Sequence, residues 1–397
     1  MQLRILHIIA SVDPRWGGPV EGILRQDDAL RAEGAREIVT LDPPDSPYAH
    51  TCSVKVHALG TGSYNKRSAS RIANFGYTPR LIPWLRENVS SYDIVIVNGL
   101  WNYSSVAASL VLPSQHVPYF VFTHGMLDPW FRRTYPFKHQ LKQMFWLLFE
   151  GRLLANAKAV LFTTSEEREL AAGQFWGHSY RADVVSYGTG DVPDREVTQT
   201  SAFRQLIPEL GDRPFFLFLS RIHEKKGCDL LIHAFKDVAE TQDDIDLVVA
   251  GPDQSGLVSS LKAIAAERGY SNRIHWPGML QGDAKWGAFR SALAFVLPSH
   301  QENFGIVVAE ALACATPVLI SDKVNIWREV QASEAGLVEP DTLAGTKKLL
   351  LTFIAMKPAE RKRMRAAARA CFIEHFDAKS TARQMLDLMR SRIAVGE

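Results

Sequence analysis

The chain has 397 residues, 46% of them hydrophobic and 22% charged, a composition typical of a globular protein long enough for two domains. The net charge of +2 argues against broad nucleic-acid binding, and no run approaches the ~20 apolar residues that a membrane-spanning helix needs. The cysteines lie far apart without metal-ligand spacing, which predicts reduced thiols in a cytoplasmic protein and no metal site: Cys52, Cys228, Cys314 and Cys371.

Strands and helices alternate through the first half of the sequence. The apolar start, MQLRILHIIASV, is interrupted by His7 and lacks a cleavage site, so it predicts a buried strand rather than a signal peptide. The alternation favours a parallel sheet covered by helices. The predicted strands are Leu3–Ile9, Ile38–Leu41, Ile94–Val97, Tyr119–Thr123 and Ala159–Thr163, and the predicted helices are Val20–Glu33, Pro79–Asn88 and Phe137–Leu154.

A polar, turn-rich stretch at 190–213 is predicted to link two domains, because the alternation restarts after it. The later strands are predicted at Phe215–Ser220, Leu247–Ala250, Arg273–His275, Leu293–Leu297 and Pro317–Ile320, and the helices at Asp229–Glu240, Leu257–Arg268 and Ile306–Cys314. Residues 342–393 show helical patterns alone. We predict an α/β protein with two doubly wound, Rossmann-like domains, whose ligands bind at the carboxyl ends of the strands. The predicted domains are 1–200, 201–375 and a C-terminal helical segment, 376–397, that packs back on the first domain.

The stretch SHQENFGIVVAEALACATPVLIS, residues 299–321, follows a predicted strand and contains two carboxylates, Glu302 and Glu310. Gly305 lets the backbone approach a ligand, and free amides at the start of the next helix suit a phosphate. The carboxylates could accept hydrogen bonds from hydroxyl groups, so the pattern predicts a ligand with hydroxyls at both ends and phosphates between them, a nucleotide sugar. The loop residues of this predicted site are Asn303, Phe304, Gly305 and Ile306. The alternative is that two glutamates flank an ordinary buried helix, although Glu310 in an apolar helix needs a partner.

A second motif, SRIHEKKG at 220–227, follows the first strand of the second half. Arg221 and Lys226 are separated by four residues, and Gly227 allows a sharp entry to the next helix. Two fixed cations would neutralise a diphosphate and stabilise the charge that builds on a leaving phosphate. The alternative is a solvated charged turn, and Lys225 is interpreted as a solvated neighbour.

A glycine pair in PRWGGPVEG, residues 14–22, follows the first strand and opens a helix. Gly17 and Gly18 could bring backbone amides close to a phosphate or an acceptor. The spacing is not that of the dinucleotide fingerprint, and a plain glycine turn is an equally good interpretation.

Two further strand ends in the first half carry polar and aromatic residues. His124 in FTHGMLDPW could bond sugar hydroxyls or a developing charge, although a single histidine is more often structural. Asn98 and Trp101 in VNGLWN suit a carbohydrate acceptor, although Trp101 could simply pack in the fold.

These motifs, in this order, resemble those of retaining glycosyltransferases of family 4, the group 1 glycosyltransferases with the GT-B fold. The resemblance covers nearly the whole chain and implies that the two domains face a central cleft, with the acceptor on the first and the donor on the second. It implies that Glu310 holds the ribose hydroxyls, that Glu302 contacts the donor sugar, and that amides near Gly305 face the diphosphate. The pattern of arginine, four residues, lysine and glycine matches Arg221 and Lys226.

The resemblance also implies roles in the first domain. The glycine-rich loop with Gly17 and Gly18 would face the cleft, and His124 would lie close to the donor sugar. One departure is visible: many relatives have glycine where this chain has Ala315.

A cationic and apolar segment, WFRRTYPFKHQLKQMFWLLFEGRLL, begins at residue 130. Its apolar set recurs at helical spacing between cations, a pattern that can lie on an anionic membrane surface. A helix packed on the sheet explains the same pattern and is the preferred interpretation.

The sequence predicts a glycosyltransferase that moves a sugar from a nucleoside-diphosphate donor to a hydroxyl acceptor with retention, in the synthesis of cell-surface or exported polysaccharide or glycolipid. The acceptor would be a carbohydrate or a lipid-linked glycan, and neither a cofactor nor a nucleic acid is expected. The protein would be cytoplasmic, with peripheral contact with the inner face of the membrane left open. The alternatives are a nucleotide-sugar epimerase or hydrolase on the same fold, and a non-catalytic protein that binds nucleotide sugars or glycans.

Overall fold

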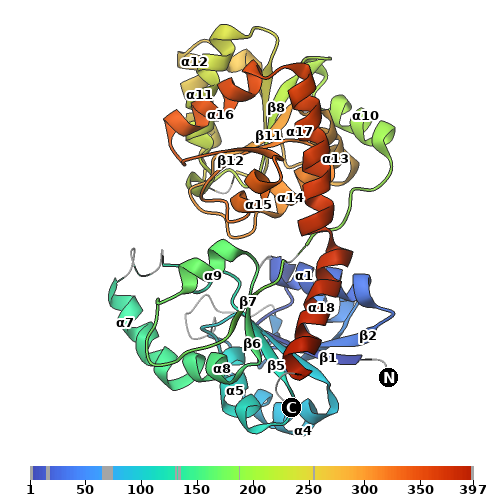
Figure 1. Cartoon of the computed structure of the whole chain (residues 1–397), viewed down its shortest axis with the longest axis vertical. Coiled ribbons are helices and arrows are strands. Elements are labelled where there is room, and N and C mark those ends of the chain that lie inside the picture. The colour runs from blue at the N-terminus through green and yellow to red at the C-terminus, as the bar shows by residue number, and fades with distance from the viewer. Residues whose placement is uncertain are drawn as a thin grey trace. The chain divides into compact units, whose positions relative to one another are not determined.

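The computed structural model describes residues 3–14, 18–64, 75–129, 132, 136–186, 188–253 and 255–394 (Figure 1). The chain divides into two compact units: unit 1 comprises Met1–Tyr187 and Thr381–Glu397, and unit 2 comprises Gly188–Ser380. The sequence placed boundaries at 200/201 and 375/376. The stretch expected to be a linker, 190–213, contains helix α10 (Glu196–Leu206), which buries Phe203 in the core of unit 2. This packing places the boundary before α10.

Among the described residues, unit 1 has one parallel sheet of seven strands in the order β3-β2-β1-β4-β5-β6-β7. The strands are β1 (Leu3–Ile9), β2 (Gly34–Thr40), β3 (Lys55–Ala58), β4 (Ile94–Asn98), β5 (Tyr119–Phe122), β6 (Ala159–Phe162) and β7 (Ala182–Val184). The five inner strands were predicted. The two edge strands, β3 and β7, were missed because they are short and only partly buried, so they show no continuous apolar run.

Both faces of the unit 1 sheet are covered, because alternate residues of each strand point to opposite faces. Leu6 and Ile8 of β1 pack in one cluster with residues of α4, α5 and α8, whereas Ile5 packs with Met385 and Met389 of the C-terminal helix α18 (Figure 1). The helices are α1 (Gly18–Leu30), α2 (Pro47–Thr51), α4 (Leu81–Asn88), α5 (Tyr103–Val111), α7 (Pro136–Phe145), α8 (Gly151–Asn156), α9 (Ser165–Ala171) and α18 (Ala378–Ala394), with short turns η3 (Val89–Ser91) and η4 (Leu112–Ser114).

The single helix predicted at Phe137–Leu154 is interrupted. A π-helical turn, η5 (Trp146–Glu150), separates α7 from α8. Trp146 and Glu150, the first and last residues of this turn, are both buried in the unit. No helix in the described part of the chain is long and apolar enough to cross a membrane.

Unit 2 repeats the same plan, with a parallel sheet of six strands in the order β10-β9-β8-β11-β12-β13 in the described chain. The strands are β8 (Phe215–Leu219), β9 (Asp246–Ala250), β10 (Ile274–Gly278), β11 (Ala294–Leu297), β12 (Val318–Ser321) and β13 (Gly336–Glu339). The partly buried edge strand β13 was not predicted. The predicted α/β class with two doubly wound domains is confirmed.

Helices lie on both faces of the unit 2 sheet, with α11 against α16 and α13 against α10 (Figure 1). The helices are α11 (Cys228–Thr241), α12 (Val258–Glu267), α13 (Gly282–Ser291), α14 (Ile306–Ala313), α15 (Trp327–Ala332), α16 (Leu343–Ala355) and α17 (Pro358–Cys371), with short turns η6 (Pro208–Leu210), η7 (Glu224–Lys226), η8 (Ser271–Arg273) and η9 (Phe372–Phe376).

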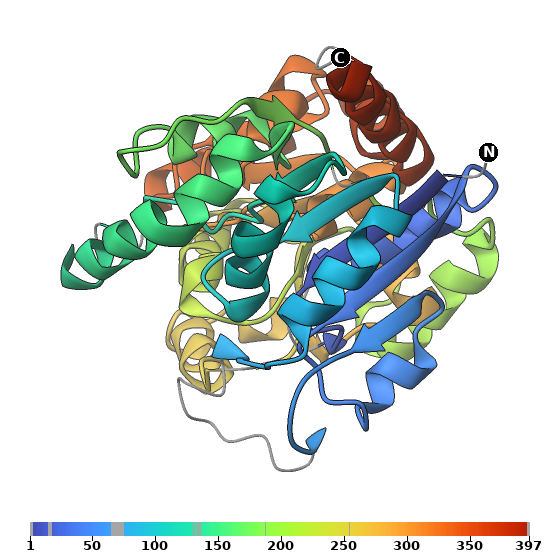
Figure 2. The same cartoon turned by 90° about the horizontal axis from the view of Figure 1, so that it is seen from below.

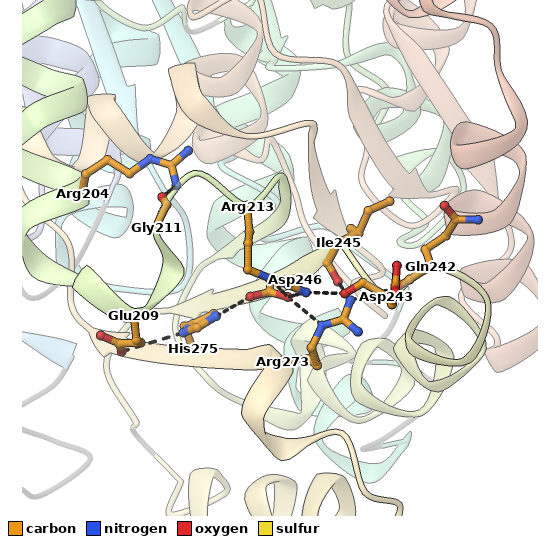
Figure 3. Close-up of polar contacts among 10 residues, drawn as sticks. All are labelled: Arg204, Glu209, Gly211, Arg213, Gln242, Asp243, Ile245, Asp246, Arg273 and His275. Atoms are coloured by element: carbon orange, nitrogen blue, oxygen red, sulfur yellow. Dashed lines mark hydrogen bonds and ion pairs between the residues drawn. The ribbon is translucent and has the colours of Figure 1, made fainter.

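A buried aspartate ties the amino ends of the unit 2 strands together (Figure 3). Asp246, the first residue of β9, accepts hydrogen bonds from Arg213 Nε at 2.9 Å, Arg273 Nε at 2.7 Å and His275 Nε2 at 2.8 Å. Burial would raise the pKa of Asp246, but these hydrogen bonds lower it to about 2. Asp246 therefore stays ionised and braces the edge of the sheet opposite the carboxyl ends of the strands.

Candidate functional site

A pocket of about 490 Å³ lies at the carboxyl edge of the unit 2 sheet. The strand order reverses between the neighbours β8 and β11, and ligands of doubly wound sheets bind at such a point. The pocket is built from the segments that follow β8, β9, β10 and β11. Its lining residues are Leu219, Ser220, Arg221, Lys226, Gly251, Pro252, Met279, Leu280, Gln281, Gly282, Lys285, Glu302, Ile306, Val307 and Glu310.

Five of the residues that the sequence singled out meet at this pocket: Arg221, Lys226, Glu302, Ile306 and Glu310. They come from two motifs that are about 80 residues apart in the chain, and the parallel pairing of β8 with β11 brings the motifs together. Arg221 is exposed, whereas Lys226 and Glu310 are buried. The pocket can therefore present charged groups at its mouth and in its interior.

The other three predicted loop residues lie beside the pocket rather than in its lining. Phe304 is buried and packs edge-on against Phe376, with ring centroids 5.8 Å apart. Asn303 Oδ1 accepts a hydrogen bond from Asn325 Nδ2 at 3.4 Å. Gly305 caps helix α14 with φ 74° and ψ 57°, a conformation that favours glycine.

The backbone amides at the amino end of α14 precede its helical hydrogen bonds. The amides of Val308 and Ala309 both donate to the Gly305 carbonyl, so the amides of Phe304, Gly305 and Ile306 precede the first turn of helical hydrogen bonds. Such amides, together with the positive end of the helix dipole, favour an anion. Because Ile306 lines the pocket, this helix end can contribute to anion binding there.

Lys226 is fixed by its turn and by an ion pair. Its Nζ contacts Glu302 Oε2, and the lysine side chain is 8% exposed. The turn is held against the segment after β11, because Ser299 Oγ donates to the Lys225 carbonyl at 2.8 Å. Gly227 has φ 64°, and a Cβ there would lie 2.1 Å from the Pro298 carbonyl oxygen, so only glycine fits this close approach.

The sequence reasoning missed a third cation in the pocket. Lys285 Nζ on α13 lies 2.7 Å from Glu310 Oε1, which gives the buried carboxylate the partner it needs. The chain around Lys285, GDAKWGAF, carries no motif, so only the packing of α13 against α14 identifies it. With Arg221, Lys226 and Lys285 against Glu302 and Glu310, three cations face two carboxylates and the lining carries a net charge of +1.

Ala315, the departure noted in the sequence, adopts φ 55° at the end of α14. A non-glycine residue in this left-handed region is strained by about 1–2 kcal/mol. The turn therefore has a geometry that favours glycine, although alanine occupies it.

The predicted residues of unit 1 form a separate group at the ends of β4 and β5. His124 has φ 49°, is stacked on Phe122, and its Nε2 lies 3.2 Å from Asn98 Oδ1. Asn98 Nδ2 lies 3.3 Å from His7 Nδ1. Burial lowers the pKa of His124 to about 3, so its imidazole is neutral at physiological pH. It can exchange hydrogen bonds there without carrying a charge.

Trp101 also lies at this strand end, with φ 67°. Its backbone amide donates to Glu150 Oε1 at 2.8 Å, and Ser105 Oγ donates to the same oxygen at 2.7 Å. Burial raises the pKa of Glu150 to about 7 despite these hydrogen bonds. The π-helical turn thus places a titratable carboxyl behind the Trp101 loop.

The glycine pair of the first loop is described in part. Gly18 is the first residue of α1, and Gly17 lies outside the described residues. In the described ranges, no group of three or more His, Cys, Asp or Glu side chains could hold a metal ion.

Comparison with known proteins identifies the fold. A sucrose-phosphate synthase from Thermosynechococcus elongatus superposes with a TM-score of 0.75 and 21% identity, over 99% of this chain and 100% of that chain. Anabaena HepE, solved in complex with UDP-glucose, superposes with a TM-score of 0.71 and 16% identity, over 98% and 100% of the two chains. The structure is thus that of a GT-B protein.

Sequence comparison gives the family. Residues 17–188 match the glycosyl transferase 4-like domain, and residues 200–370 match the model for glycosyl transferases group 1. The chain therefore belongs to the group 1 glycosyltransferases of family 4, as the resemblance of its motifs implied. A D-inositol 3-phosphate glycosyltransferase from Frankia alni is 32% identical over 238 residues, which span 56% of this chain and 56% of that relative.

Proposed function

We propose that the protein transfers a sugar from a nucleoside-diphosphate sugar to a hydroxyl acceptor with retention of anomeric configuration. The observation that carries the proposal is the pocket at the β8–β11 switch point. It combines a buried lysine, an exposed arginine, an open helix end and two carboxylates within one cavity. Cations and amides suit the diphosphate of a donor, and the carboxylates suit hydroxyl groups on either side of it.

The charges of the pocket fit such a donor. The lining carries a net charge of +1, and Lys226 is already oriented by Glu302 before a ligand arrives. A diphosphate would share Lys226 with this carboxylate and add contacts to Arg221. Because the cations are fixed in advance, they can stabilise the extra negative charge of the leaving phosphate without reorganising.

In this proposal Glu310 holds the ribose hydroxyls and Glu302 contacts the donor sugar. The bond between the anomeric carbon and the phosphate oxygen breaks while the acceptor oxygen attacks from the same face. The leaving phosphate takes the proton of the acceptor hydroxyl. The role of His124 close to the donor sugar, as a neutral hydrogen-bonding group, belongs to the same proposal, as does that of Gly17 and Gly18 close to a phosphate or the acceptor.

The acceptor in this proposal is a carbohydrate or a lipid-linked glycan used for cell-surface or exported polysaccharide or glycolipid. Curated relatives named D-inositol 3-phosphate glycosyltransferases make inositol phosphates a further acceptor class to assay, although the alignment spans only 56% of the Frankia relative. HepE was solved with UDP-glucose, which makes uridine donors the first to try. The enzyme would work in the cytoplasm, where such donors are made available to it.

The test measures release of nucleoside diphosphate from a panel of nucleotide sugars, with and without candidate acceptors, followed by NMR of the product. The proposal expects release that depends on an acceptor and a product with the anomeric configuration of the donor. Release at the same rate without acceptor would support a hydrolase or epimerase instead. Binding of a donor without any turnover across the panel would support a non-catalytic binding protein, and an inverted product would refute retention.

A further inference from the structure

An apolar stripe on unit 1 lies in solvent. Phe137, Leu141, Met144 and Leu148 are 90%, 68%, 62% and 63% exposed. They are spaced by four, three and four residues, so they share one side of α7 and of the turn η5 that continues it. The sequence favoured the interpretation that this apolar set packs on the sheet, and for these four side chains that prediction is wrong, because they are exposed. The structure places other side chains inward, with Gln143, Trp146 and Glu150 buried, and leaves the stripe uncovered.

A further exposed tryptophan lies on the segment that is bonded to α7. Trp176 is 68% exposed, and its backbone is fixed to α7 by two hydrogen bonds with the Gln143 side chain, at 3.1 and 3.2 Å. Helix α7 extends outward at the edge of its unit, at the left of Figures 1 and 2. The four side chains of the stripe therefore share one side of a projecting element, which is more than scattered surface residues would give.

The charges around the stripe have one sign. Arg132, Lys138 and Arg152 are exposed at its two ends. In the sequence from 131 to 152 the single acidic residue is Glu150, which is buried, and the adjacent stretch 172–181 contains no acidic residue. An apolar face flanked by cations, on stretches whose one carboxylate is buried, matches a bilayer surface, which is apolar inside and anionic outside.

We infer that this stripe docks unit 1 on an anionic lipid bilayer, with the apolar side chains inserted at the level of the headgroups and the cations on the lipid phosphates. The inference deepens the proposed function, since a bilayer is where a lipid-linked acceptor would be found. Lipid binding is measured without donor or acceptor, so its failure would leave the transfer proposal standing.

The experiment is flotation of the full chain with vesicles of phosphatidylcholine alone or mixed with phosphatidylglycerol, at low and high salt. The wild-type chain should float with the mixed vesicles at low salt and be released by salt. Replacing Phe137, Leu141 and Met144 by glutamine should raise the lipid concentration for half-maximal binding at least ten-fold, because their insertion is lost. Glutamine favours helix and these side chains are exposed, so the fold should persist, as circular dichroism would check.

Matched controls separate the stripe from general surface effects. Val197→Gln with Leu206→Gln removes two exposed apolar side chains from α10 in unit 2 and should leave binding unchanged. Lys138→Glu with Arg152→Glu should weaken binding to the anionic vesicles at least ten-fold, since each cation near the surface contributes about 1 kcal/mol. Arg268→Glu, an exposed charge reversal in unit 2, should have little effect.

Three outcomes would overturn the inference. The wild-type chain could fail to float with anionic vesicles at low salt. The triple glutamine variant could float as well as the wild type. Light scattering could show a dimer that the triple variant dissolves, which would assign the stripe to a second copy of the chain.

Discussion

Replacing Lys226 by alanine tests the proposed diphosphate contact. The lysine is 8% exposed and is paired with Glu302, which is 22% exposed, so its charge acts in a partly desolvated environment. A hydrogen bond to a charged group contributes about 1.5–3 kcal/mol, which corresponds to a loss of about 10–150-fold in affinity for a nucleoside diphosphate. The loss in transfer should be larger, about 10³-fold in kcat/KM, because charge on the leaving phosphate grows during the reaction.

The chain offers a matched control in the neighbouring residue. Lys225 is exposed and its Nζ lies 3.4 Å from Gln301 Oε1, so Lys225→Ala removes the same charge from the same turn without touching the pocket lining. Isothermal titration with nucleoside diphosphates should show weakened binding for Lys226→Ala and near-normal binding for Lys225→Ala. Equal effects of the two substitutions, with both variants folded, would refute the assigned role of Lys226.

Three other substitutions give distinct expectations. Glu150→Gln should raise the free energy of unfolding above pH 7 by up to about 3 kcal/mol. The pKa of Glu150 rises from 4.5 to about 7 on folding, so the wild type loses stability as the pH increases between these values. Urea denaturation at a series of pH values should therefore show a flatter stability profile for the variant. A profile parallel to the wild type would contradict this. Ala315→Gly should stabilise the chain by about 0.5–1 kcal/mol in the same assay, because it relieves the strain at φ 55°, and destabilisation would contradict the argument. Lys285→Met should destabilise the folded chain by about 2–4 kcal/mol and weaken nucleotide binding, because it leaves Glu310 buried without its cation. Lys285→Arg should retain much of the stability and of the binding. Unchanged nucleotide binding in the methionine variant would show that Lys285 is not part of the site.

The fold could be predicted wherever the physical signal is local. The inner strands of both sheets are continuous apolar runs, because helices cover both faces, and such runs are visible in the sequence. The edge strands β3, β7 and β13 are only partly buried and show no such run. Helix α10 lies in a stretch rich in polar residues and prolines, and its burial of Phe203 depends on contacts distant in sequence.

The residues of the candidate site could also be predicted only where the signal is local. Arg221, Lys226, Glu302 and Glu310 stand in motifs with strand ends and glycines beside them, and this local context is visible in the amino-acid sequence. Lys285 has no such context, since its role depends on a 2.7 Å contact with a residue of another helix.

Two features of unit 1 could not be predicted for the same reason. The π-helical turn that contains the buried Glu150 cannot be recognised in the sequence, because its residues continue the apolar helical pattern. The exposure of Phe137 and its neighbours also depends on which face of the helix meets the sheet, and periodicity alone does not determine that.

The central claim is that the pocket between the segments after β8 and β11 binds the nucleoside diphosphate of a sugar donor. Thermal unfolding with a panel of nucleoside diphosphates and their sugars, first without metal and then with magnesium, tests it most directly. At a concentration about 100–1,000 times the Kd, a ligand should stabilise the wild-type chain by about 3–4 kcal/mol, and the same ligand should stabilise Lys226→Ala much less. No stabilisation by any member of the panel, or equal stabilisation of the wild type and the variant, would contradict the account.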